Sequence, residues 1–231
     1  MNSQTGVLAI SILMCTWASS LEATESKTES GTVLVPLALE LPQPSFSGTP
    51  LVYSSPNFEE PAFTRRKPFL APIGTINLAK GKPVTSSDPA PHFGKLSFLT
   101  DGEKDFHNEF LLELNAGVQW IQIDLGATSE LYAVLVWHFH ASDRVYFDVV
   151  VQISDDPTFS NKVTTFYNND LDNSAGLGSG KDKEYVENFE GRLIDAQGAH
   201  GRYVRLYSNG NTTDDTNHYV EVEAYGKSLK D

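Results

Sequence analysis

The residue types that could carry chemistry in this sequence argue against catalysis. The chain contains neither the Gly-x-Ser-x-Gly motif of a nucleophile elbow nor the His-Glu-x-x-His motif of zinc proteases. Residues 176–181 (GLGSGK) are only superficially similar to a phosphate-binding loop. Ala175 replaces the first glycine of that motif, and Asp182 occupies the position of the Ser or Thr that binds magnesium. We therefore expect neither a hydrolase nor a nucleotide-binding site.

A second candidate is the acidic segment 170–176 (DLDNSAG). Its alternating oxygen-bearing side chains, followed by a glycine, are similar to the start of a calcium loop. The glutamate that closes such a loop is missing, because Lys181 stands at its position. We interpret the segment as a solvated turn, and a second cation site is the alternative.

A third candidate is the segment 137–146 (WHFHASDRVY), which joins two apolar runs. This position predicts a loop that carries His140, Arg144 and Tyr146. An arginine fork and a neutral histidine can hydrogen-bond to a polar ligand, and an aromatic ring can pack against its apolar face. The alternative is structural: the aromatic rings belong to the core, and Arg144 pairs with Asp143 or Asp148.

Short β-like runs surround these candidates from residue 76 onward. The runs are rich in β-branched and aromatic residues, are separated by turn residues, and show no helical period. They are 120–125 (WIQIDL), 132–137 (YAVLVW), 149–153 (VVVQI), 163–167 (VTTFY), 203–207 (YVRLY) and 219–225 (YVEVEAY). Near-continuous apolar runs are typical of strands covered on both faces. The pattern predicts an all-β sandwich or jelly roll.

Five segments of this region resemble discoidin (coagulation-factor type C) domains and the related galactose-binding-like carbohydrate-binding modules. In chain order they are 77–87 (NLAKGKPVTSS), 99–102 (LTDG), 120–126 (WIQIDLG), 202–206 (RYVRL) and 221–226 (EVEAYG). The resemblance implies a discoidin-type jelly-roll β-sandwich over residues 76–226. The disulfide pairs of many animal discoidin domains are absent, which favours the carbohydrate-binding-module branch.

The resemblance also implies two sites. Asp101, in the Asp-Gly turn, and Glu221, at the start of the last strand, would ligate a structural Ca²⁺, with Asp105 as a further oxygen donor. His92 matches a ligand histidine of fucose-binding relatives. Asn217, followed by His218, lies on a loop that often closes the same site. Otherwise, Asp101 would only cap a turn and Glu221 would be a solvated strand residue.

The N-terminal third has a different composition. Residues 1–20 carry no charged side chain, and an apolar run at 7–17 is followed by small residues, which predicts a signal peptide cleaved after Ser20. A lipoprotein signal at Cys15, the only cysteine, is disfavoured by Met14 before it. Eleven of the twelve prolines lie between Pro36 and Pro91. We therefore expect residues 21–75 to form a proline-rich linker or arm.

The net charge of −13 limits the possible partners. So acidic a chain is unsuited to nucleic acid or to anionic lipid, and it is compatible with cations. We expect a non-catalytic module without a transmembrane segment that binds carbohydrate, is stabilised by Ca²⁺ and works outside the cytoplasm, whether secreted or periplasmic. The alternative is an extracellular protein-interaction or adhesion domain that binds no sugar.

Overall fold

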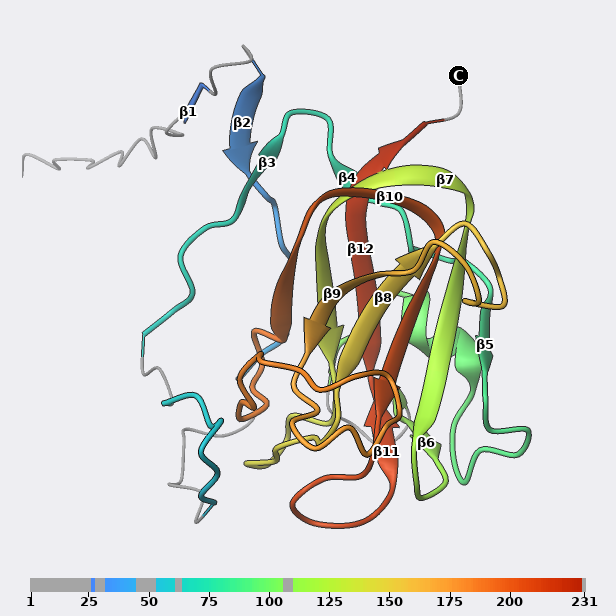
Figure 1. Cartoon of the computed structure of the whole chain (residues 1–231). Helices are drawn as coiled ribbons and strands as arrows, with labels where there is room; N and C mark the ends of the chain where they lie inside the picture. Colours follow the sequence, from blue (N-terminus) through green and yellow to red (C-terminus); the bar gives the residue numbers. More distant parts are fainter. Residues whose placement is uncertain (1–25, 28–31, 45–52, 61–63, 106–109, 230–231) are drawn as a thin grey trace, which may run out of the picture.

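The computed structural model describes residues 26–27, 32–44, 53–60, 64–105 and 110–229 (Figure 1). The predicted signal peptide lies outside these residues. Within them, the only helix is the 3-10 helix η1 (Leu96–Thr100), and no helix is long and apolar enough to cross a membrane. The strands are β1 (Ser26–Lys27), β2 (Val33–Pro36), β3 (Leu70–Pro72), β4 (Ile76–Asn77), β5 (Val84–Ser86), β6 (Leu112–Leu114), β7 (Gln119–Trp137), β8 (Val150–Ser154), β9 (Thr164–Asn168), β10 (Arg192–Ser208), β11 (Asn217–Tyr219) and β12 (Glu221–Ser228).

The main sheet is antiparallel and folds back on itself. Its strand order is β4-β12-β7-β10-β8-β9, and β5 pairs with the first half of β7. The second half of β7 lies between β12 and the first half of β10. Strands β7 and β10 therefore arch together over one end of the sandwich (Figure 1). The two predicted strands 120–125 and 132–137 are the two halves of β7, joined through Gly126, which has a positive φ of 86°.

Alternating residues of β7 face two different apolar clusters. Val134 and Val136 belong to the main core, whereas Leu135 and Trp137 belong to a second cluster that also contains Tyr225. Side chains of the N-terminal arm cover this second cluster, among them Leu37, Leu39 and Phe69. Both faces of the strand are thus buried, which explains its near-continuous apolar sequence. The prediction of an all-β jelly-roll sandwich is confirmed.

Several described segments of the proline-rich arm contact the sandwich. Strands β1, β2 and β3 form a small antiparallel sheet. The Arg66 side chain donates hydrogen bonds to the carbonyl oxygens of Glu190 and Gly191, at 3.0 and 2.8 Å. Glu59 forms an ion pair with Arg192 at 2.7 Å. That residues 21–75 are a separable arm stays a prediction.

The loops that carry polar side chains gather at the end of the sandwich opposite the arch (Figure 1). They are 138–149, between β7 and β8; 169–191, between β9 and β10; and 209–216, between β10 and β11. The arch brings both ends of β7 and of β10 to this end. Segments that are far apart in the sequence therefore meet there.

Candidate functional site

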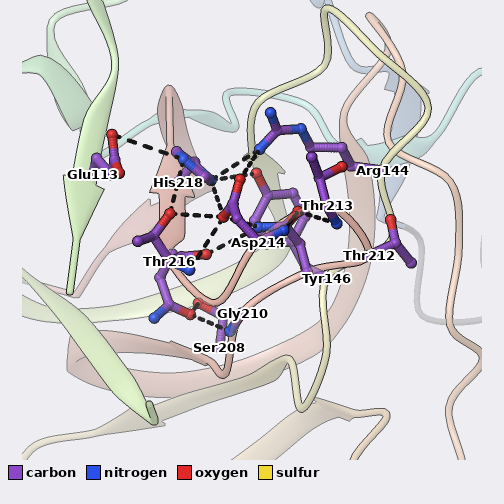
Figure 2. Close-up of polar contacts among 12 residues, drawn as sticks. Glu113, Arg144, Tyr146, Ser208, Gly210, Thr212, Thr213, Asp214, Thr216 and His218 are labelled. Carbon is purple, nitrogen blue, oxygen red and sulfur yellow. Dashed lines mark hydrogen bonds and ion pairs between the residues drawn. The ribbon is translucent and has the colours of Figure 1, made fainter. Parts of the chain in front are cut away.

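A cluster of four polar side chains and one aromatic ring lies among these loops, hereafter the Arg144 cluster. Its polar members are Arg144, Asp214, Thr216 and His218 (Figure 2), and its ring is that of Phe139, which lies beneath the Arg144 guanidinium. Arg144 Nη1 donates a hydrogen bond to Asp214 Oδ2 at 3.1 Å and lies 3.4 Å from His218 Nδ1. The Arg144 guanidinium also lies over the Phe139 ring, 4.7 Å from its centroid. The cluster thus combines a half-buried donor fork with an aromatic face, both of which suit a polyhydroxylated ligand.

His218 lies at the centre of this cluster and is held from several directions. Its Nδ1 lies 3.0 Å from the Tyr146 hydroxyl, and its Nε2 lies 3.2 Å from Thr216 Oγ1 and 3.9 Å from Glu113 Oε2 (Figure 2). Burial lowers the pKa of His218 below the ordinary histidine value, although the nearby Asp214 carboxylate opposes this shift. The imidazole is therefore neutral at neutral pH and can both donate and accept a hydrogen bond.

Asp214 supplies the negative charge that balances Arg144. Although burial opposes the shift, hydrogen bonds from Thr216 and Asn211 lower the pKa of its carboxyl group. The Arg144–Asp214 pair is thus ionised at neutral pH, and its charges cancel. With a neutral His218 beside it, the cluster presents many hydrogen-bonding atoms and little net charge.

Two residues that the sequence predicted for ligand binding lie at this cluster: Arg144 is a member, and Tyr146 supports it. Tyr146 is 2% exposed, stacks on His138 at a centroid distance of 4.4 Å, and contacts His218 through its hydroxyl. Because the Tyr146 ring is buried, it positions His218 and does not offer a ring face to a ligand.

The structure corrects the expectation for His140 and Asn217, because both are fully buried. His140 Nε2 lies 2.9 Å from the carbonyl oxygen of Lys104. Asn217 accepts hydrogen bonds from Ser208 and Gly210, and it donates to the carbonyl oxygens of the 115–118 turn. Both side chains therefore tie loops together and are not available for a ligand.

His92 is exposed and lies one residue before Phe93, which forms a bridge with Glu113 of β6. This register places the His92 backbone close to the strand whose Glu113 side chain approaches His218. A contact between His92 and the Arg144 cluster stays a prediction.

Sequence reasoning overlooked Glu113, Asp214 and Thr216. The polar run 211–216 (NTTDDT) before the last strands is a signal that could have directed attention to Asp214 and Thr216. Glu113 carries no such signal, because it lies between two buried leucines of β6. It approaches His218 only because β6 pairs with β11 in the folded chain.

The predicted calcium ligands lie around the start of β12. Glu221 is fully buried, and neither of its carboxylate oxygens has a hydrogen-bond partner among the described residues. Burial raises the pKa of Glu221 to about 8. The Gly102 amide and the Lys104 ammonium group oppose this rise, and the Glu223 and Asp101 carboxylates add to it. The Lys104 ammonium group lies 2.9 Å from Glu223. A buried carboxylate without a partner is costly unless a cation satisfies it, so Glu221 fits a metal site.

Asp101 is exposed at the end of η1, and its Oδ1 accepts a hydrogen bond from the Glu103 amide at 2.8 Å. It therefore does cap a turn, and its other oxygen is open to a further ligand. Asp105 is half-buried. Within the described chain, the oxygens of Asp101, Asp105 and Glu221 do not all come within 4.8 Å of one another.

The fold and this site define an all-β sandwich protein with a polar, nearly neutral cluster among the loops at one end. No protein-family model matches the sequence, and no curated protein matches it. Several solved structures are similar to the chain. A fucose-binding module from Streptococcus pneumoniae is 19% identical, with a TM-score of 0.46, over 65% of this chain and 97% of the module.

Two further examples are a chitosan-binding module and a whole enzyme. The chitosan-binding module, from Paenibacillus sp. IK-5, is 22% identical, with a TM-score of 0.41, over 65% of this chain and 99% of the module. The Clostridium perfringens glycoside hydrolase CpGH89, in complex with GlcNAc-α-1,4-galactose, is 17% identical, with a TM-score of 0.49, over 67% of this chain. The matched region spans only 15% of that hydrolase.

Proposed function

We propose that the chain is a non-catalytic carbohydrate-binding module that works outside the cell and binds its ligand at the Arg144 cluster. The observation that carries this proposal is the arrangement of Arg144. Its guanidinium group is fixed between Asp214 and the Phe139 ring, at 3.1 and 4.7 Å, and it remains partly exposed. A fork of donors beside a ring matches the alternation of hydroxyls and apolar C–H faces on a sugar.

The charge state of the cluster supports a neutral or weakly charged ligand. Arg144 is already paired with Asp214, so a strongly anionic ligand would have to displace that carboxylate or tolerate it. The half-buried Thr216 hydroxyl, 3.2 Å from the buried and neutral His218, can act as donor or acceptor toward a sugar hydroxyl. Neutral hexoses and amino sugars are therefore the ligand class we propose.

We further propose that a structural Ca²⁺ binds at Glu221 and Asp101. Both carboxylate oxygens of the buried Glu221 lack a hydrogen-bond partner among the described residues, and the Asp101 carboxylate is close enough to raise the pKa of Glu221. Calcium takes roughly six to eight oxygen ligands, so backbone carbonyls and water would complete the shell. This ion would fix the 101–105 turn to the start of β12, next to the loop that leads to Arg144.

A glycan array tests the proposed function. The full chain, in calcium-containing buffer, should bind a limited set of immobilised glycans, and the soluble form of the same sugar should compete with that binding. A chain that binds no neutral, amino or acidic glycan on the array would contradict the proposal, and it would favour a protein-interaction domain instead.

A further inference from the structure

A separate cavity of about 440 Å³ opens among the same loops, hereafter the acidic cavity. It is lined by Phe147, Asp148, Asn169, Leu171, Asp172, Ser174, Glu184 and Asn209. Asp148 comes from the loop before β8, and Asp172 comes from the loop after β9. Beside them lies Asp170, and the carboxylate oxygens of Asp148, Asp170 and Asp172 all come within 4.8 Å of one another.

The three carboxylates are held in place by neutral donors. Asp148 Oδ2 accepts hydrogen bonds from the Ser174 hydroxyl at 2.6 Å and from the Asn209 amide at 2.8 Å. The two oxygens of the buried Asp170 accept from the backbone amides of Ser174 and Ala175. In the part of the chain that the structure describes, no Lys, Arg or His forms an ion pair with any of the three aspartates. Their negative charge is therefore concentrated and not balanced by a nearby basic side chain.

Two buried side chains of the same cavity point independently to a ligand. Asn169 is 2% exposed and Glu184 is 8% exposed. Asn169 Nδ2 and Glu184 Oε2 have no hydrogen-bond partner among the described residues. The amide of Asn169 is oriented by the hydrogen bond that its Oδ1 accepts from the Val149 backbone, at 2.6 Å. Glu184 Oε1 already accepts from the Tyr53 hydroxyl at 2.9 Å.

The cavity thus contains a donor, Asn169 Nδ2, and an acceptor, Glu184 Oε2, that lack partners among the described residues. Water can satisfy both, because it donates and accepts hydrogen bonds. The excess of carboxylates calls for a cation. A hydrated divalent cation satisfies both requirements, because its ligating oxygens are carboxylates while its bound waters reach the second layer of polar groups.

We propose that the acidic cavity binds a Ca²⁺ ion, ligated directly by Asp148, Asp170 and Asp172, with bound water that contacts Asn169 and Glu184. Oxygen atoms stand at alternating positions of one turn, as in calcium loops, and they belong to Asp170, Asp172 and Ser174. The glutamate that closes such a loop is replaced by Lys181, and Asp148 supplies a carboxylate in its place. This site is distinct from the one at Glu221 and does not depend on carbohydrate binding.

Calorimetric titration of the full, chelator-treated chain with Ca²⁺ tests this proposal. The Glu221→Gln background removes the other proposed site. In that background we expect one remaining equivalent of calcium to bind, and the additional substitution Asp172→Asn should weaken it by roughly tenfold or more. Asp172 is exposed, and an asparagine there can still accept the hydrogen bond that Asp172 Oδ1 receives from the Ser174 amide at 3.0 Å. The fold should therefore survive the substitution.

Asp195→Asn is the matched control. Asp195 is exposed and accepts one backbone hydrogen bond from the residue two positions on, as Asp172 does. The control should leave calcium binding unchanged. Should Glu221→Gln not fold, the comparison is made in the wild-type chain, where Asp172→Asn should weaken one of two equivalents by the same factor. The proposal is overturned if Asp172→Asn leaves the stoichiometry and the affinity unchanged, or if only the Glu221 site binds calcium.

Discussion

The Arg144 cluster and the acidic cavity lie at the same end of the sandwich and share the 138–149 loop, yet they differ in how their charges are balanced. Arg144 is paired with Asp214 and lies beside a neutral His218. Asp148, four residues after Arg144, faces two further aspartates instead. The first arrangement suits a polar ligand of little charge, and the second suits a cation. One loop can therefore serve two binding chemistries, because successive residues contact different neighbouring loops.

The largest expected effect on stability concerns the 209–216 loop, which serves both regions: Asp214 reaches Arg144, and Asn209 reaches Asp148. Asn217→Ala removes four hydrogen bonds: two from Ser208 and Gly210, at the start of this loop, and two to the carbonyl oxygens of Asn115 and Gly117. We expect the free energy of unfolding to fall by about 3 kcal/mol, as measured by denaturant titration. The exposed Asn161→Ala should change it by less than about 0.5 kcal/mol. An Asn217→Ala chain as stable as wild type would mean that Asn217 does not hold the loop.

The next effect separates the two calcium proposals. A ligand that binds only the folded state stabilises it by about 2.7 kcal/mol at roughly 100-fold saturation. Calcium at the Glu221 site should supply stabilisation of this order, and Asp172→Asn should retain it. Glu221→Gln and Asp101→Ala should lose this contribution and keep only the contribution of calcium in the acidic cavity. Thermal melting with calcium and with chelator measures the difference, and equal melting temperatures for the wild type in both buffers would contradict the Glu221 site.

A smaller effect concerns the balance of charge around Arg144. Because burial lowers the pKa of His218, the unfolded chain takes up a proton at this residue before the folded chain does as the pH falls. The stability contributed by neutral His218 is therefore complete above the ordinary histidine pKa of about 6.5 and is lost as the pH falls below it. His218→Gln should make stability less sensitive to pH between neutrality and mild acid. Parallel pH profiles for the two chains would show that His218 is not buried in a neutral form.

The sequence predicted the fold well because the apolar runs report burial directly. The run 132–137 indicated a doubly covered strand, and β7 is covered by the main core and by the arm. It predicted the site less well because burial and proximity of polar residues depend on the whole fold. His140 lies on a loop and Asn217 at the start of β11, yet both side chains are fully buried. Asp148 lies 22 residues before Asp170, so the 170–176 segment alone gave no sign that a third carboxylate would meet it.

The central claim is that Arg144 binds the sugar, and the affinity of Arg144→Ala tests it most directly. With a glycan identified on the array, calorimetry should show a loss of roughly ten- to a hundred-fold in affinity relative to wild type. The melting temperature should change little, because a partly exposed ion pair contributes at most about 1 kcal/mol. Arg202→Ala is the control: Arg202 also pairs with an aspartate, Asp124, at 2.7 Å compared with 3.1 Å for Arg144 and Asp214, and it lies away from the Arg144 cluster. The account predicts normal binding by Arg202→Ala and weak or no binding by Arg144→Ala, and equal affinities for the two variants would contradict it.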